Sequence, residues 1–197
     1  MADFAPEHLS PKTQFANPDV VGLSGFAISS LVLQVHNFDQ CNAAPVVALG
    51  LVYGGFVQLV AGFLEFVVGN SFGCCAFTGY GSFWLALSTL LLFKQQDIYD
   101  ITHKELGWFF IGYTAFTAIL VIGTLRRNLC ETFLFGSLLL GFILLDIHAF
   151  VDSDVLKLLA SIVLTLDSLI AFYAVGHHVL KDTFKTDVLP LGKPLLP

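Results

Sequence analysis

Three pairs of a small residue followed by a large apolar residue recur along the chain. The pairs are Gly25-Phe26, Gly79-Tyr80 and Ser137-Leu138. The intervals from Phe26 to Tyr80 and from Tyr80 to Leu138 are nearly equal, and each is about the length of a two-helix hairpin. If the three large side chains meet at one depth of a helical bundle, they form an apolar constriction of the kind that gates small solutes by dewetting. The spacing therefore predicts a narrow apolar path.

Asp167 is an ionisable residue near the middle of a long apolar stretch. If this stretch crosses a membrane as a helix, an acid near its middle is costly and marks function by default. Desolvation favours its neutral form, so we predict that Asp167 borders the path and assists proton-linked transport. The alternative interpretation is an acid hydrogen-bonded between helices. His36 and Glu65 are further candidates for proton coupling. Glu65 could instead reach the membrane–water interface or pair with a neighbouring side chain.

Motifs for cofactor, metal or nucleic-acid binding are not found in the sequence. It has no phosphate-binding glycine loop, no Cys-x-x-Cys and no His-x-x-x-His pair. Nine Lys and Arg against fifteen Asp and Glu give a formal charge of -6, without the basic patch that nucleic-acid binding needs. The sequence therefore predicts no enzyme activity, no cofactor, no metal site and no nucleic-acid partner.

The composition indicates that the elements carrying these residues lie in a lipid bilayer. Hydrophobic residues make up 56% of the 197 residues and charged residues 12%, which leaves too few charges for a water-facing surface. Six apolar stretches are long enough to cross the hydrocarbon core as helices. They run over 20–36, 44–69, 71–93, 106–125, 129–151 and 155–180. We predict an all-α membrane protein with six transmembrane helices, arranged as three tandem helical hairpins around a central pore.

The flanking charges predict the orientation of the helices. If both termini share one side, that side holds Lys12, Arg126, Arg127, Lys181, Lys185 and Lys193, and the other holds Lys94, Lys104 and Lys157. This excess predicts that both termini are cytoplasmic. Residues 1–19 do not resemble a signal peptide and are predicted as an N-terminal tail, residues 20–180 as the membrane domain and residues 181–197 as a C-terminal tail.

Small residues recur every four positions in the second stretch. Gly50, Gly54, Gln58 and Gly62 share one face of a helix, which predicts a surface where another helix packs closely. Gln58 is predicted to bond across helices.

Five motifs occur in order along almost the whole chain. They are NPDVVGLSGF (17–26), HN (36–37), YGGFVQLVAGFLE (53–65), GNSFGCCAFTGYGSFW (69–84) and VLPLG (188–192). Together they resemble the acetate uptake transporter family, which includes the bacterial succinate–acetate permeases. The first motif departs from the family signature Asn-Pro-Ala-Pro-Leu-Gly-Leu at Asp19, Val20 and Val21.

The resemblance implies a function and a set of site residues. It implies uptake of acetate and related short carboxylates, with succinate in some members, across the cell membrane by a hexamer of independently conducting subunits. It also implies that Phe26, Tyr80 and Leu138 form the constriction, and that Ala171 affects substrate size.

A carboxylate must lose water to cross such a constriction, which costs several kcal/mol without compensation. It could cross as the neutral acid, which amounts to carrying a proton, or as an anion that hydroxyl groups meet. Candidate donors are Ser29, Thr78, Ser82 and the phenol of Tyr80, which combines an apolar wall with a hydrogen bond. The sequence leaves both routes open, and with them a channel or a proton-coupled transporter.

Asn17 and Pro18 suit the start of the first helix, with Asn17 as N-cap and Pro18 at the first helical position. The positive helix end could attract a carboxylate at the cytoplasmic mouth, although Asp19 would compete with it. Helix initiation alone explains both residues equally well.

Two other functions are compatible with the same architecture, because a fold does not determine a function. The first is a channel for a small neutral solute such as urea or an amide. The second is a membrane structural or sensor protein.

Overall fold

Residues 16–197 fold into six helical spans that are long and apolar enough to cross a membrane. The computed structural model describes residues 16–197, and the remainder of the predicted N-terminal tail lies outside the described residues. The helices are α1 (Asp19–Asn37), α2 (Ala44–Leu51), η1 (Val52–Val57), α3 (Gln58–Val67), α4 (Ser71–Gln95), α5 (His103–Thr124), α6 (Leu129–Val151) and α7 (Asp154–Phe184). The second span comprises α2, η1 and α3, and η1 is a π-helical turn. The all-helical fold class is confirmed, and α7 extends four residues further than predicted, to Phe184.

Polar side chains cap the N-terminal ends of three helices. Asn70 and Asn128 cap α4 and α6 by accepting hydrogen bonds from backbone amides three residues on, at 3.1 and 2.8 Å. Thr102 and Glu105 form a capping box at the start of α5. Residues 69–73 have the Gly-x-Ser-x-Gly spacing of a nucleophile elbow, but they join two helices and not the strand and helix that an elbow requires.

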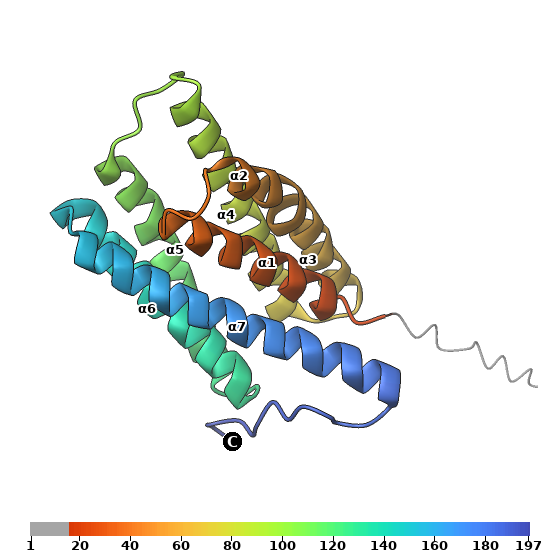
Figure 1. The fold of residues 1–197 in the computed structure, drawn as a ribbon. Helices are drawn as coiled ribbons and strands as arrows, with labels where there is room; N and C mark the ends of the chain where they lie inside the picture. Colours follow the sequence, from red (N-terminus) through yellow and green to blue (C-terminus); the bar gives the residue numbers. More distant parts are fainter. Residues whose placement is uncertain (1–15) are drawn as a thin grey trace, which may run out of the picture.

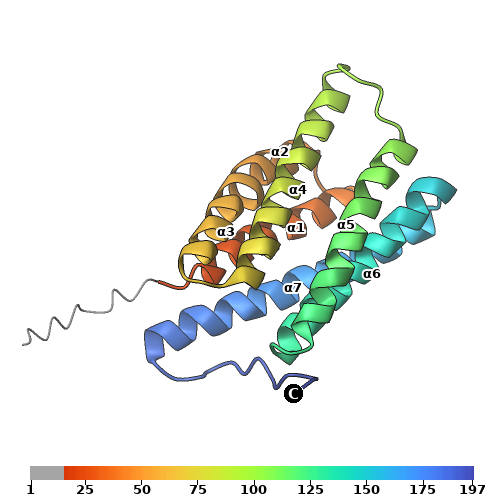
Figure 2. The same cartoon turned by 180° about the vertical axis from the view of Figure 1, so that it is seen from behind.

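The spans form a bundle in which sequence neighbours are not always the closest partners (Figures 1 and 2). α1 packs against α7 and against the second span, α3 packs on α4, and α6 packs between α5 and α7. The backbones of α4 and α5 are close to each other at only a few positions. Aromatic side chains fill the space between the two helices. The ring centroid of Phe83 lies 4.8 Å from that of Tyr113, and the centroid of Tyr80 lies 5.5 Å from that of Phe116. The middle hairpin is thus joined mainly through side chains.

Glycines bring the second span against its neighbours. A Cβ atom at Gly62 would lie 2.6 Å from the backbone nitrogen of Thr78 on α4. One at Gly54 would lie 2.5 Å from the hydroxyl of Ser29 on α1. Both distances are too short for a side chain, so glycine permits this close packing.

The two ends of the bundle differ. The terminal end, which we define as the end with both chain termini, includes the links 68–70 and 125–128. The C-terminal segment lies across it, where Leu191 accepts a hydrogen bond from the Cys130 amide (2.9 Å) and the Leu196 amide donates to Leu125 (2.8 Å). The loop end is the opposite end, with the links 38–43, 96–102 and 152–153.

Candidate functional site

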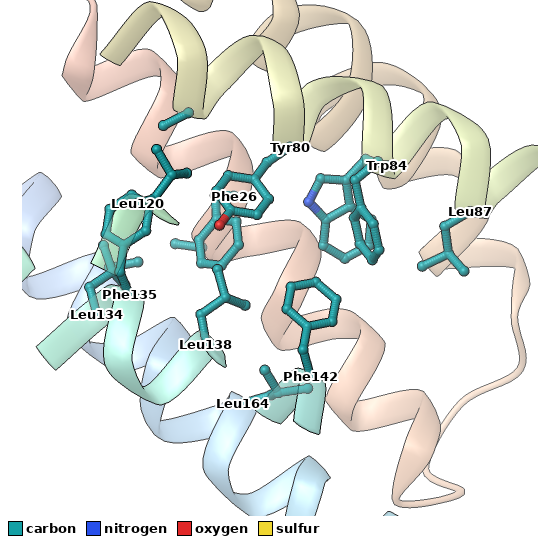
Figure 3. Packing of buried hydrophobic residues seen from close by; sticks show 14 of the residues in the cluster. Phe26, Tyr80, Trp84, Leu87, Leu120, Leu134, Phe135, Leu138, Phe142 and Leu164 are labelled. Atoms are coloured by element: carbon teal, nitrogen blue, oxygen red, sulfur yellow. The ribbon is translucent and has the colours of Figure 1, made fainter. Parts of the chain in front are cut away.

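Phe26, Tyr80 and Leu138 meet inside the bundle although they come from α1, α4 and α6. The ring centroids of Phe26 and Tyr80 are 6.0 Å apart, and all three side chains are buried. Figure 3 shows them between two further groups of apolar side chains, with Trp84 and Phe142 on one side. We call these three residues the constriction.

A cavity of about 310 Å³ reaches from the loop end to the constriction. Leucine and aromatic side chains form most of its wall. Polar and charged side chains also line it, namely Ser30, Gln34, His36, Asn37, Lys94, His103, His148 and Lys157. We call this cavity the vestibule. The two lysines make it attractive to an anion, because a cleft lined by one sign of charge concentrates the opposite sign.

Two small cavities continue on the other side of the constriction. The first, of about 20 Å³, is lined by Phe26, Tyr80 and Leu138 together with Gln58, and we call it the inner cavity. It has room for about one water molecule. The second, of about 30 Å³, lies at the terminal end and shares apolar wall residues with the inner cavity. Its polar lining residues are Asp19, Arg127, Glu131 and His178. The three cavities therefore lie in series along one path, and the constriction separates the vestibule from the other two.

Gln58 places an unpaired amide in this path. Its side chain is 1% exposed, and neither the Oε1 nor the Nε2 atom has a hydrogen-bond partner among residues 16–197. A buried polar group without a partner costs about 1–3 kcal/mol, so this amide has the capacity to bind a polar solute or water. The predicted bond from Gln58 to another helix is therefore wrong. A polar residue in an apolar stretch was the only sequence signal for this site.

The phenol of Tyr80 is hydrogen-bonded to α5. Its oxygen lies 2.9 Å from Thr117 Oγ1, and the Thr117 hydroxyl donates to the backbone carbonyl of Tyr113 at 2.7 Å. Because the threonine proton is used in this way, Tyr80 donates to Thr117. Tyr80 thus contributes its ring to the constriction, and its hydroxyl proton is engaged on α5.

The other predicted hydroxyl donors are also bonded elsewhere. Thr78 donates to the carbonyl of Cys74 at 2.7 Å, and Ser82, which is exposed, donates to the carbonyl of Thr78 at 2.8 Å. Ser29 faces the second span, 3.5 Å from the carbonyl of Leu49. Hydroxyls in apolar helices commonly bond to nearby backbone carbonyls. None of these three residues, which the sequence predicts as candidate donors to the solute, lines the vestibule or the two smaller cavities.

Asp167 and Ala171 lie on the buried face of α7, behind the constriction. Both are 0% exposed. Asp167 Oδ1 lies 2.9 Å from the hydroxyl of Ser137, the neighbour of Leu138, and Asp167 Oδ2 has no partner among the described residues. Neither Asp167 nor Ala171 lines the vestibule or the smaller cavities. The structure therefore places both next to the path and not on it.

The remaining candidates lie at the two ends of the bundle. Glu65 is buried at the terminal end, where its carboxylate accepts a hydrogen bond from Asn70 Nδ2 at 2.7 Å. His36 lines the vestibule, and its Nδ1 donates to the carbonyl of Cys41 at 2.8 Å. Glu65 thus pairs with a neighbour, as its alternative interpretation proposes, and His36 is positioned near the entrance to the path.

The first helix starts one residue later than predicted. α1 begins at Asp19, so Pro18 and not Asn17 occupies the N-cap position. Asn17 Oδ1 still accepts a hydrogen bond from the Asp19 amide at 3.0 Å, and Asn17 Nδ2 lies 3.2 Å from His178 Nδ1 on α7. Asn17 therefore ties α1 to α7, whereas Asp19 and His178 line the cavity at the terminal end.

Comparisons with known proteins agree with this architecture. The family model described as the GPR1/FUN34/yaaH family matches residues 1–192. The chain is 34% identical over 183 residues to the succinate-acetate/proton symporter SatP of Escherichia coli K12, covering 92% of this chain and 97% of that protein. It is 37% identical over 147 residues to acetate permease A of Emericella nidulans, covering 68% of this chain and 49% of that protein. The solved structure of the bacterial acetate channel SatP matches with a TM-score of 0.87 at 34% identity, covering 91% of this chain and 100% of that chain.

Proposed function

Because the chain belongs to the GPR1/FUN34/yaaH family, we propose that it transports acetate and related short carboxylates, including succinate, across the plasma membrane. The named relatives are transport proteins, which favours transport over catalysis. The observation that carries the proposal is the path itself. An apolar constriction separates a wide vestibule from a small cavity that contains one unpaired amide.

The substrate crosses the constriction as the neutral acid. Burying an unpaired carboxylate costs several kcal/mol even after the protein relaxes, and no basic side chain lines the inner cavity. Protonating an acid with a pKa of about 4.3 at pH 7 costs about 4 kcal/mol. Protonation costs no more than burying one unpaired carboxylate and leaves no charge in the constriction, so each carboxyl group carries one proton with it: one for acetate and two for succinate.

The donor and acceptor groups of the Gln58 amide match those of this neutral acid. Gln58 Nε2 can donate to the carbonyl oxygen of the acid while Gln58 Oε1 accepts from its hydroxyl. An ionised carboxylate only accepts, so it would satisfy Nε2 and place negative charge against Oε1. A neutral amide such as urea has the same donor and acceptor pattern as the acid. A channel for such a solute is therefore the second candidate function.

Flux into proteoliposomes containing the purified protein distinguishes the two candidates. We would measure acetate, succinate and urea at pH 7 and pH 6, and subtract the leak into protein-free liposomes. Acetate flux at constant total acetate should rise roughly tenfold between these pH values, because the fraction of neutral acid does. Acetate flux that does not change with pH would contradict crossing as the acid. Urea flux without carboxylate flux would establish the second function.

Two variants test the role of Gln58 in the same assay. Gln58→Leu removes both amide groups at similar volume and should lower acetate flux at least tenfold, since the acid then meets only apolar atoms. Thr78→Val is the matched control, because its hydroxyl is bonded to its own helix off the path. Equal flux through wild type and a folded Gln58→Leu protein would remove Gln58 from the path.

We also propose that the terminal end faces the cytoplasm and that the protein is a homo-oligomer, a hexamer by family resemblance. Arg126, Arg127 and Lys181 lie at the terminal end, in keeping with the preference of positive charge for the cytoplasmic side. The path lies within one chain, so each subunit would conduct by itself. Exposed phenylalanines on the second span, Phe56, Phe63 and Phe66, supply apolar surface for lipid or a neighbouring subunit. Native mass spectrometry would count the subunits.

A further inference from the structure

A histidine pair and an aspartate meet at the loop end, outside the constriction. His103 is the first residue of α5, His148 lies in the last turn of α6, and Asp152 is the C-cap of α6. One potential ligand atom from each residue lies within 4.8 Å of the others. The two imidazole rings are 5.9 Å apart between centroids, and both histidines line the vestibule. The antiparallel packing of α5 on α6 brings these residues together from distant positions in the sequence.

The hydrogen bond of His148 leaves its Nε2 atom available to a cation. Its Nδ1 lies 3.0 Å from the carbonyl of Ser153. A carbonyl only accepts, so Nδ1 carries the proton and Nε2 has a free lone pair in the neutral ring. This pattern, a ligand histidine oriented by a backbone carbonyl, is typical of metal sites. His148 and Asp152 also lie at the C-terminal end of α6, where the partial negative charge of the helix favours a cation.

The donor set and its dimensions suit a zinc-like ion. Two imidazoles and one carboxylate are common zinc ligands at about 2.0–2.2 Å, and ligands around a tetrahedral ion are then roughly 3.4 Å apart. Closing from 4.8 Å requires shifts of about 1 Å, which the exposed side chains of His103 and Asp152 can make. Lys94 and Lys157 also line the vestibule and oppose a cation, whereas the carboxylate of Asp152 offsets part of that charge.

We propose that His103, His148 and Asp152 bind one divalent transition-metal ion of the zinc class at the entrance of the vestibule. Three protein ligands leave a fourth position for water, which is an open coordination geometry. The sequence predicts no metal site because its spacing patterns detect ligands that are close in sequence, whereas these come from the ends of two helices. The site does not depend on the transported solute, so it stands apart from the proposed function.

Metal titration of the full chain in detergent tests the site. After removal of bound metal, Co²⁺ should produce the absorption bands of nitrogen and oxygen coordination, and Zn²⁺ should displace it with one ion bound per chain. His103→Ala, His148→Ala and Asp152→Asn should each weaken Zn²⁺ binding at least tenfold. Each variant should also lose the Zn²⁺-dependent rise in Tm, because an ion that binds only the folded state stabilises it.

The control is His36→Ala, which removes another vestibule histidine whose Nδ1 is bonded to Cys41. Its Zn²⁺ affinity should equal that of wild type. The metal-free Tm of each variant shows whether it is folded. Because His103 and Asp152 are exposed, we expect their replacement to leave the fold intact. Unchanged Zn²⁺ binding in folded His103→Ala and Asp152→Asn proteins would overturn the proposal, as would binding that is lost only when His177 or His178 is replaced.

Discussion

Tyr80 on α4 and Thr117 on α5 share a buried hydrogen bond of 2.9 Å between their hydroxyl oxygens. The bond crosses the one pair of consecutive spans whose backbones barely touch. It therefore has two effects. It joins α4 to α5 where helix packing does not, and it engages the phenol proton at Thr117 while Tyr80 lines the constriction.

Replacing Tyr80 by phenylalanine should change stability more than transport. Tyr80→Phe removes one hydrogen bond, worth about 1 kcal/mol, and keeps the ring that forms the wall. Acetate flux in proteoliposomes should stay within about threefold of wild type. Tyr80→Ala, which removes the wall, should change the flux and its selectivity. A folded Tyr80→Phe protein without flux would show that the hydroxyl takes part in transport.

Shortening Leu138 should widen the constriction and admit larger solutes. Leu138→Ala should raise the ratio of succinate flux to acetate flux, and should lower the free energy of unfolding by about 2–5 kcal/mol because a cavity is left. Leu140→Ala is the matched control, since Leu140 lies on the same helix but is exposed on the outside of the bundle. An equal change of selectivity in the two variants would argue against the constriction.

Hydropathy predicted the six spans, and the spacing of small and large residues together with the family resemblance predicted the meeting of Phe26, Tyr80 and Leu138. Apolar length determines the spans, and helices that run in one direction bring residues of similar depth together. Side-chain orientation was less predictable. Thr78 and Ser82 lie within the same helical stretch as Tyr80, but their hydroxyls bond to backbone carbonyls, which a pattern of residue types does not show.

The pattern of residue types also did not predict how helices that are distant in the sequence pack on one another. Gln58 follows the π-helical turn η1, and its place in the inner cavity depends on how the second span packs on α1 and α4. His103 and His148 are close only because α5 and α6 are antiparallel and end at the same level. Asp167 was recognised as unusual from its depth, but its contact with Ser137 and its distance from the path required the structure.

Two glycine substitutions should have opposite effects on stability. Gly62→Ala should destabilise the protein, because the added Cβ would lie 2.6 Å from the backbone of Thr78 and force α3 away from α4. Gly112→Ala on α5 meets nothing within 4 Å and should stabilise the protein by up to about 1 kcal/mol through helix propensity. Thermal unfolding in detergent measures both. A stabilising Gly62→Ala would show that α3 and α4 are not closely packed.

Native Cys41 can report the orientation of the bundle. It lies in the link between α1 and α2 at the loop end, which is extracellular if the terminal end is cytoplasmic. A membrane-impermeant maleimide added to intact cells should therefore label a protein in which the other three cysteines, Cys74, Cys75 and Cys130, are replaced by serine. Labelling that requires permeabilised cells would reverse the orientation. Cys41→Ser in the same background gives the unlabelled control.

Asp167→Asn should leave acetate flux and its pH dependence close to wild type. The Ser137 hydroxyl lies 2.8 Å from the carbonyl of Phe133 as well as 2.9 Å from Asp167 Oδ1, so its one proton can serve the carbonyl while the acid donates to its oxygen. The asparagine NH₂ group can replace that donor, whereas Asp167→Leu cannot and should lower stability by about 1–3 kcal/mol by leaving a polar group unpaired. Flux at pH 7 and pH 6, with Tm as the folding control, tests this. If Asp167→Asn folds but loses the rise of flux at low pH, Asp167 carries a proton in transport. The proton would then pass between the path and Asp167 from behind Leu138.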